Sequence, residues 1–260
     1  MFAIFKREFL SYFRTPVGWI AISLLSAISG FYYSQMISAS VPYVNINMEL
    51  AYLRTFFIIL IPIITMRLFA EEKKNGTDVL LYTMPYSMKA AVLGKFLAAM
   101  ALQGLMLICV FTHIIYTVVL SGYVGPETWG SILSYLVLAA LFISIGMLTS
   151  AMTENQIMSA VVCFVVLFVL NMLSSIAESV STVVKTILKF THLFGLSDQS
   201  IYNVGERIRR IIVWFDPFEK TSCFTSGVFK IVPLVFCLSF TVMFVYITYR
   251  VLEKKRWAQS

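Results

Sequence analysis

Six long apolar stretches constrain this chain more than any other feature of its sequence. A helix needs roughly 20 mostly apolar residues to cross a bilayer, and each stretch is close to that length. With 59% hydrophobic and only 13% charged residues, the chain has too little polar surface to cover a globule in water. The sequence therefore predicts an all-α membrane protein with six transmembrane helices. We place these spans at residues 17–38, 51–70, 92–120, 131–152, 156–177 and 230–252.

The second predicted span is the least regular of the six. Arg54 and Arg67 bracket a short apolar core, and Pro62 lies inside it. Proline is tolerated in membrane helices where neighbouring groups satisfy the freed carbonyl, so we keep this span.

Lysine and arginine lie unevenly beside the spans, and this asymmetry indicates the orientation. With the N-terminus in the cytoplasm, the two short outer loops carry only Arg54, while the inner segments carry most of the basic residues. The connection of residues 178–229 is also basic and would lie outside. At about 50 residues, however, it is close to the length beyond which the basic residues of a loop no longer indicate orientation. We therefore expect both termini in the cytoplasm. The net charge of +7 then reflects topology and anionic lipid rather than nucleic acid.

An aromatic and basic segment, residues 1–16, precedes the first span. Its aromatic side chains recur at three- and four-residue steps, and the basic side chains lie off this stripe; the aromatic set is Phe2, Phe5, Phe9, Tyr12 and Phe13. The pattern is typical of a helix that lies in the membrane interface. An amphipathic anchor with no further role is the alternative interpretation.

A charged segment separates the second and third spans. Asn75 and Gly76 predict a turn, because both residues tolerate a left-handed backbone. Thr77 can then cap a short helix with Asp78 near its positive end, and Pro85 marks where that helix must stop.

Residues 66–85 contain the pattern Glu-x-x-x-Gly-Thr-x-x-x-Leu-hydrophobic-x-x-Pro. The pattern resembles the segment after the second membrane helix in permease subunits of ABC-2-type ABC transporters. In that family it forms the coupling helix, which docks on the ATPase, and an N-terminal elbow helix packs beside it. The resemblance implies a coupling segment at residues 71–91, with ATPase-coupling residues Glu71, Glu72, Gly76, Thr77, Asp78, Leu80, Leu81 and Pro85.

Two further segments extend this resemblance over nearly the whole chain. The inner turn of residues 150–157, which contains Glu154, resembles the second cytoplasmic contact of these permeases. Residues 218–228 resemble the re-entrant segment that precedes their last helix.

The carboxylates of Glu71 and Glu72 end the second span beside the elbow. We expect at least one of them to pair with Arg7 or Arg14 and so tie the elbow to the coupling helix. Because an exposed pair contributes only about 0–1 kcal/mol, the tie should matter more for coupling than for folding.

The resemblance implies half of a paired permease, homo- or heterodimeric, that works with two ATPase subunits. The sequence contains no Gly-x-x-x-x-Gly-Lys-Ser/Thr phosphate loop, since Gly94-Lys95-Phe96 lacks both the preceding glycine and the following hydroxyl. We therefore expect no catalytic residue and no cofactor in this chain, with ATP and Mg²⁺ bound by the partner. The implied function is ATP-driven export from a bacterial cytoplasmic membrane. An apolar, aromatic pathway favours an amphiphilic cargo, such as a lipid-like molecule, a hydrophobic peptide or a drug.

Polar side chains at membrane depth need an internal partner or a water-filled path. Tyr32, Tyr33, His113 and Asn171 are candidates to line a pathway, although such residues more often make interhelical hydrogen bonds or belong to the aromatic belt. No carboxylate lies in the middle of a predicted span, which argues against an ion-driven carrier. The cysteines show no Cys-x-x-Cys spacing and predict no metal site. A non-transporting scaffold that docks a cytosolic partner is the alternative function.

The connection between the fifth and sixth spans, residues 178–229, is longer than the resemblance leads us to expect. Two apolar stripes at helical spacing run through it opposite basic side chains: Val183, Ile187, Phe190 and Phe194, then Ile201, Val204, Ile208, Ile211 and Phe215. They predict extracytoplasmic amphipathic helices at the membrane interface. A lid over the outer end of a pathway and a plain packing element are the two interpretations.

Overall fold

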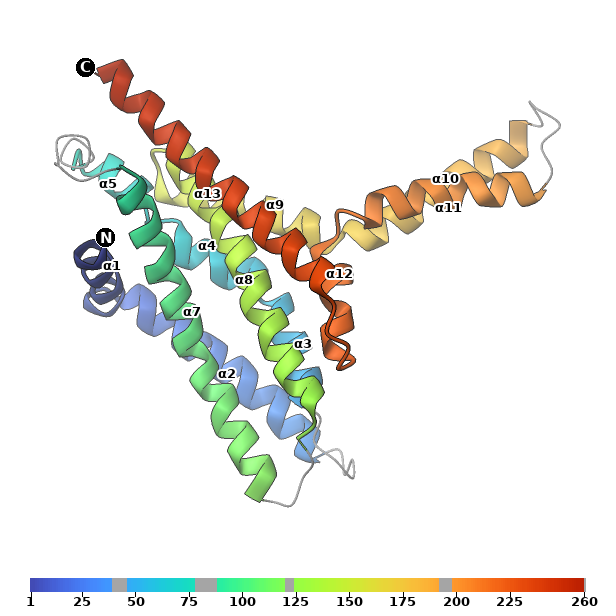
Figure 1. Ribbon diagram of the computed structural model, residues 1–260, viewed down its shortest axis with the longest axis horizontal. Coiled ribbons are helices and arrows are strands. Elements are labelled where there is room, and N and C mark those ends of the chain that lie inside the picture. Colours follow the sequence, from blue (N-terminus) through green and yellow to red (C-terminus); the bar gives the residue numbers. More distant parts are fainter. Residues whose placement is uncertain (39–45, 78–87, 120–123, 192–197, 260) are drawn as a thin grey trace.

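The computed structural model describes residues 1–38, 46–77, 88–119, 124–191 and 198–259. Within these ranges all regular secondary structure is α-helical, which confirms the predicted all-α class (Figure 1). The helices are α1 (Phe2–Arg14), α2 (Pro16–Ser38), α3 (Ile46–Thr55), α4 (Phe57–Thr65), α5 (Ala70–Lys74), α7 (Met88–Val119), α8 (Pro126–Met152), α9 (Gln156–Asn171), α10 (Leu173–Thr191), α11 (Asp198–Val213), α12 (Pro217–Thr225) and α13 (Ile231–Gln259).

Among the described residues, four helices are long and apolar enough to cross a membrane, namely α2, α7, α8 and α13. Two helix pairs pass the same test together but are bent, α3–α4 by 55° and α9–α10 by 56°. The described chain thus has four candidate spans, or six if each bent pair is one span. Several helices are longer than predicted, since α7 begins at Met88, α8 begins at Pro126 and α13 continues to Gln259.

The helices in the region of the predicted second span, residues 51–70, have other limits than that span. Its helical part begins at Ile46, is interrupted at Phe56 and stops at Thr65. Arg54 consequently lies inside the bundle, 8% exposed, and its guanidinium donates a 2.8 Å hydrogen bond to Ser134 Oγ. The difference arises because the apolar run continues through the interruption, so that hydropathy alone does not reveal it.

Helix α8 is the centre of the bundle. In its most apolar 18-residue window 78% of the residues are buried, against 22% in α13 and 28% in α2. Many of its buried residues are small, among them Ser131, Ser134, Ala139, Ser144 and Gly146, and small residues let membrane helices approach closely. At Gly146 a methyl group would lie 2.2 Å from Thr65 Oγ1, so α4 packs directly on the backbone of α8.

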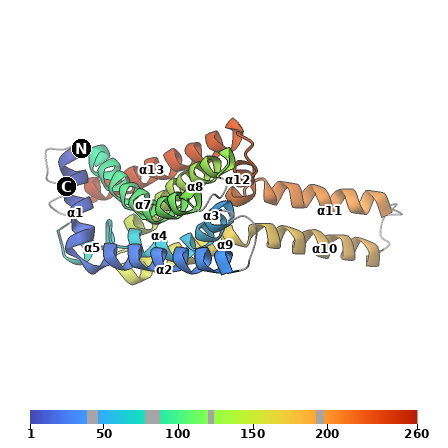
Figure 2. The ribbon, with the colours of Figure 1, turned by 90° about the horizontal axis from the view of Figure 1, so that it is seen from below.

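Helix α1 lies across one end of the bundle, and both chain termini lie at that end (Figures 1 and 2). The peripheral helices α2, α9 and α13 expose many large apolar side chains, as expected for surfaces that face lipid. The hairpin of α10 and α11 projects sideways from the bundle (Figure 1). This position does not support the lid interpretation of residues 178–229.

Candidate functional site

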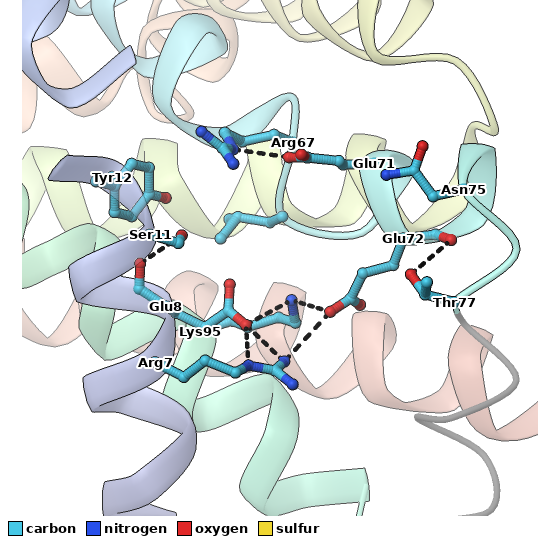
Figure 3. Close-up of a pocket in the computed structure, with 11 residues that line it drawn as sticks. Arg7, Glu8, Ser11, Tyr12, Arg67, Glu71, Glu72, Asn75, Thr77 and Lys95 are labelled. Carbon is cyan, nitrogen blue, oxygen red and sulfur yellow. Dashed lines mark hydrogen bonds and ion pairs between the residues drawn. The ribbon is translucent and has the colours of Figure 1, made fainter. Parts of the chain in front are cut away.

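Three helices meet at a group of charged side chains near the end of the bundle where the termini lie (Figure 3). Arg7 and Glu8 come from α1, Glu72 from α5 and Lys95 from α7, and we call these four residues the ionic cluster. Lys95 Nζ lies 2.9 Å from Glu72 Oε1 and 3.3 Å from Glu8 Oε1. Arg7 Nη2 lies 2.7 Å from Glu8 Oε1 and 3.4 Å from Glu72 Oε1. Each carboxylate contacts both cations, so the cluster joins the three helices.

Lys95 is the most deeply buried member of the cluster, with 1% of its side chain exposed. An ammonium group removed from water is stable only when it is paired and hydrogen-bonded, and the two carboxylates provide both. Lys95 Nζ also makes a cation–π contact with Phe69, whose ring centroid lies 5.2 Å away. Next to Lys95, a methyl group at Gly94 would lie 3.1 Å from Ile4 Cγ2, so the glycine lets α1 approach α7 closely. This approach keeps Glu8 within reach of Lys95.

The charges of the cluster favour its ionised form. Burial opposes ionisation of Glu8, but the charges of Lys95 and Arg7 and their hydrogen bonds outweigh burial and lower the pKa of the carboxyl. Burial also opposes the charge on Arg7, yet its hydrogen bond to Glu8 and the charges of Glu8 and Glu72 raise the pKa of the guanidinium. At neutral pH, Arg7 and Glu8 therefore hold α1 as charged groups.

The second half of α1 is tied to the chain that leads into α5. The buried Tyr12 hydroxyl donates a 3.1 Å hydrogen bond to the carbonyl oxygen of Ile64, at the end of α4. Arg67 donates to Thr15 Oγ1 and, at 2.8 Å, to Glu71 Oε2. The region from Tyr12 to Thr15 is thus held at the end of α4 and in the turn that leads to α5.

Helix α5 is also held by the end of α8. Ser150 Oγ accepts hydrogen bonds from the backbone N–H groups of Phe69 and Ala70 at 3.0 and 3.1 Å, and donates to the carbonyl oxygen of Met66 at 3.2 Å. A side chain of another helix therefore satisfies donors at the start of α5, where no intrahelical partner exists. Lys73 Nζ donates to the carbonyl oxygens of Ala151 and, at 3.1 Å, of Thr153. Cations are favourable at such helix C-termini, so α5 and α8 are linked at both ends of the shorter helix.

A polar cavity of about 250 Å³ lies among these contacts (Figure 3). Its walls are the ionic cluster together with Ser11, Tyr12, Arg67, Leu68, Glu71, Asn75 and Thr77. In the described part of the chain, no group of three or more His, Cys, Asp or Glu side chains could hold a metal ion. The chemistry of this region is ion pairing between helices, and it makes α5 a joint shared by α1, α7 and α8.

A family model described as ABC-2 family transporter protein matches residues 2–257. The chain belongs to the ABC-2 transporter family. It is a membrane-spanning permease of an ABC transporter, which is the transport component and not the catalytic one. A search of curated proteins found no match.

In this ABC-2 permease, the ion pair expected between residues 1–16 and the carboxylates of Glu71 and Glu72 is present for one carboxylate. Glu72 pairs with Arg7, whereas Glu71 pairs with Arg67 on the preceding turn. For Arg14, the described residues provide no ion-pair partner. The tie therefore runs through Arg7 and Glu72.

The predicted turn at Asn75 and Gly76 is confirmed, because Gly76 has a φ of 68°. The Thr77 N–H bonds to the Glu72 carbonyl at 2.9 Å and the Gly76 N–H to the Lys73 carbonyl at 3.1 Å. This pair of bonds is the Schellman ending of a helix, so the turn closes α5. The rest of the predicted coupling helix, with Asp78, Leu80, Leu81 and Pro85, lies outside the described residues. Glu154 is exposed in the turn between α8 and α9.

The sequence prediction gave Lys95 no role in a site and so missed its central place there. A signal was present, because Lys95 lies inside the predicted span 92–120, and a cation at membrane depth needs a partner. Its partners were not predictable, because Glu8 and Glu72 are distant in sequence and meet it only through the packing of α1 and α5 on α7.

Two of the four pathway candidates of this permease, Tyr33 and His113, contact each other, and His113 also contacts a carboxylate that the sequence prediction missed. Glu49 of α3 is fully buried, and its Oε1 lies 2.8 Å from His113 Nδ1 and accepts a 2.5 Å hydrogen bond from Ser29. Tyr33 stacks on the His113 ring at 4.2 Å, with an interplanar angle of 5°. Glu49 escaped prediction because the second span begins earlier than expected.

The other two pathway candidates are less enclosed. Tyr32 stacks on Tyr52 of α3 at 4.4 Å between ring centroids, which favours a packing role. Asn171 is half-buried at the last residue of α9, beside the bend into α10.

Proposed function

We propose that this permease is half of an ATP-driven exporter, in which two permease chains work with two ATPase subunits that bind ATP and Mg²⁺. Both termini then lie in the cytoplasm with α5 and the ionic cluster, in agreement with the distribution of basic residues along the chain. Residues 71–91 dock on the ATPase, and the turn that contains Glu154 makes a second contact.

The observation that carries this proposal is the way α5 is held. Ion pairs and hydrogen bonds connect it to α1 through Arg7, to α7 through Lys95 and to α8 through Ser150. A segment docked on a moving ATPase can displace three helices together only if it is linked to all of them. Rigid-body displacement of packed elements is a common form of such a transition. A scaffold that only anchors a partner requires no such joint.

The proposed cargo is an amphiphilic molecule, for example a lipid-like compound, a hydrophobic peptide or a drug. This part of the proposal is supported by composition alone, because 59% of the residues are hydrophobic and 15% are aromatic. Nucleic acid is not a proposed partner, since membrane topology and anionic lipid account for the basic charge.

Docking is tested by Leu81→Asp, a change in the segment that the sequence matches to the coupling helix. Burying one leucine in a partner groove contributes roughly 1.5–3 kcal/mol, so the variant should weaken association with the ATPase by about one to two powers of ten. Co-purification of the ATPase with the permease measures this effect. Membrane insertion should be unchanged, because the site lies outside the spans.

Val124→Asp, in the opposite loop, is the matched control and should retain the ATPase. If Leu81→Asp binds the ATPase normally while the Val124→Asp control loses it, the docking surface lies elsewhere and the scaffold function is favoured.

A further inference from the structure

Helices α10 and α11 form an antiparallel hairpin that projects from the bundle (Figures 1 and 2). The two helices meet through small or buried residues, Ala177 and Ser181 on α10 and Ile201 and Gly205 on α11. At Gly205 a methyl group would lie 2.3 Å from Lys185 Cε, so the side chain of α10 crosses directly over the backbone of α11.

Each helix also exposes an apolar stripe beside this contact. The stripes, which together we call the apolar face, are Ile176, Val180, Val183, Ile187 and Phe190 on α10, and Val204 and Ile211 on α11. Spacings of three, four or seven residues keep each stripe on one side of its helix. Exposure reaches 85% at Phe190 and 64% at Ile211, which is costly for side chains of this kind in water.

Both stripes lie on the same side of the hairpin. On α10 the exposed Val180 directly precedes the packed Ser181, and on α11 the exposed Val204 directly precedes the packed Gly205. One residue is a rotation of about 100° in an α-helix, so each stripe is offset from its packing face by the same amount and in the same sense. An antiparallel pair is related by a two-fold axis perpendicular to the plane of its helices, and equal offsets therefore fall on one side.

The opposite side of the hairpin is charged. Lys185 Nζ lies 2.9 Å from Glu206 Oε1, and Arg209 Nε lies 3.5 Å from Glu206 Oε2. Lys185 Nζ also lies 4.5 Å from the ring centroid of Tyr202. The hairpin as a whole thus has one mainly apolar and one charged side, a division found in helices that lie in a membrane interface. The exposed Arg207 lies beside Val204 and Ile211 on the apolar side, and a long arginine side chain can extend from there to the head groups.

The apolar face continues a surface that already belongs to the membrane. Helix α9 passes the test for a membrane span together with α10, from which it is bent by 56°. The exposed Val161, Val165 and Phe168 of α9 recur at a spacing of three and four residues, and Met172 after α9 and Ile176 and Val180 of α10 continue it. Because the hairpin extends sideways from α9, this continuity directs its apolar face toward the acyl chains and not toward water.

We propose that the α10–α11 hairpin lies along the membrane surface, with its apolar face inserted among the acyl chains of one leaflet and its charged side at the head groups. In the orientation proposed above, this is the outer leaflet. The occupant of the apolar face is lipid, and a second copy of the chain is the competing occupant.

The test uses the full chain, with its native cysteines replaced, in vesicles of phosphatidylcholine and phosphatidylglycerol. Single cysteines at Val183 and Ile211 on the apolar face, and at Thr182 and Asn203 away from it, carry a bimane fluorophore. We expect brominated acyl chains to quench the first pair and aqueous iodide to quench the second. Equal iodide quenching at all four positions would overturn the proposal. The proposal would also be overturned if neither quencher reached the first pair and crosslinks formed between copies of the chain, because the apolar face would then be a protein interface.

A second set of variants keeps the test independent of local damage. Val183→Asp with Ile211→Asp should abolish bromolipid quenching of a fluorophore at Val204, whereas Thr182→Asp with Asn203→Asp should leave it unchanged. Equal losses in both variants would contradict insertion of one specific face. Neither experiment involves an ATPase or a cargo, so its outcome is separate from that of the transport proposal.

Discussion

At the scale of single residues, the ionic cluster depends on Lys95, whose ammonium group neutralises two carboxylates from two other helices. In Lys95→Met, Glu8 and Glu72 would face each other without this cation. We expect the free energy of unfolding to fall by about 3 kcal/mol. This value is the lower end of the range for a broken buried ion pair, because both carboxylates are partly exposed. Thermal unfolding in detergent measures it.

Lys89→Met, at an exposed position on the same helix, is the matched control and should change little. Adding Glu72→Gln to Lys95→Met should restore part of the loss, because it removes one unpaired charge. Equal stability of Lys95→Met and the wild type would show that the cluster contributes nothing to the fold.

The lowered pKa of Glu8 gives the cluster a pH dependence with a definite sign. The unfolded chain protonates this carboxyl near its ordinary value of 4.5, while the folded protein resists protonation to lower pH. The unfolded state therefore binds more protons in this window, and stability falls as pH falls below about 4.5. Melting temperatures between neutral pH and pH 3 should decline more steeply for the wild type than for Glu8→Gln. The exposed Glu219→Gln should follow the wild type, and parallel curves for all three proteins would refute the assignment.

At the scale of helices, the contact between α4 and α8 depends on the absence of a side chain at Gly146. Gly146→Ala places a methyl group 2.2 Å from Thr65 Oγ1, and such overpacking costs typically about 1–3 kcal/mol. Gly104→Ala is the matched control, since nothing lies within 4 Å of its added methyl group. Alanine there should be neutral or stabilising, by up to about 1 kcal/mol. The thermal unfolding temperature should therefore fall in Gly146→Ala and stay level or rise in Gly104→Ala, and an undiminished stability of Gly146→Ala would contradict the packing.

The sequence predicts helices well where composition alone determines them, and less well where packing does. The apolar runs that became α2, α7, α8 and α13 are visible because a bilayer demands length and hydropathy together. The bends after Thr55 and Asn171 are not visible, because apolar residues continue through them. For the same reason Arg54 and Glu49 were assigned to an outer loop or overlooked, although both are buried in the bundle.

The candidate site shows the same division between local and tertiary information. The turn at Gly76 follows from the conformational freedom of two adjacent residues, so local sequence was sufficient to predict it. A pair between Glu71 or Glu72 and Arg7 or Arg14 was expected from charge and from the family resemblance, and Arg7 with Glu72 is the pair that forms. The role of Ser150 could not be expected, because a serine in an apolar helix carries no sign that it will cap a different helix far away in sequence.

At the scale of the whole molecule, we propose that α5 moves α1, α7 and α8 together when the ATPase subunits close. The most direct measurement is the distance between spin labels at Val124 on the two permease chains of the assembled transporter, with and without ATP and vanadate. We predict that this distance changes on nucleotide trapping in the wild type and in Glu71→Gln, whose partner Arg67 is local.

The variant Glu72→Gln with Lys95→Met removes the link from α5 to α7 while leaving the docking segment intact. We predict that it still assembles with the ATPase and hydrolyses ATP, but that the distance between the labels no longer responds to nucleotide. A nucleotide-dependent change as large as that of the wild type would contradict the claim that the ionic cluster transmits the motion.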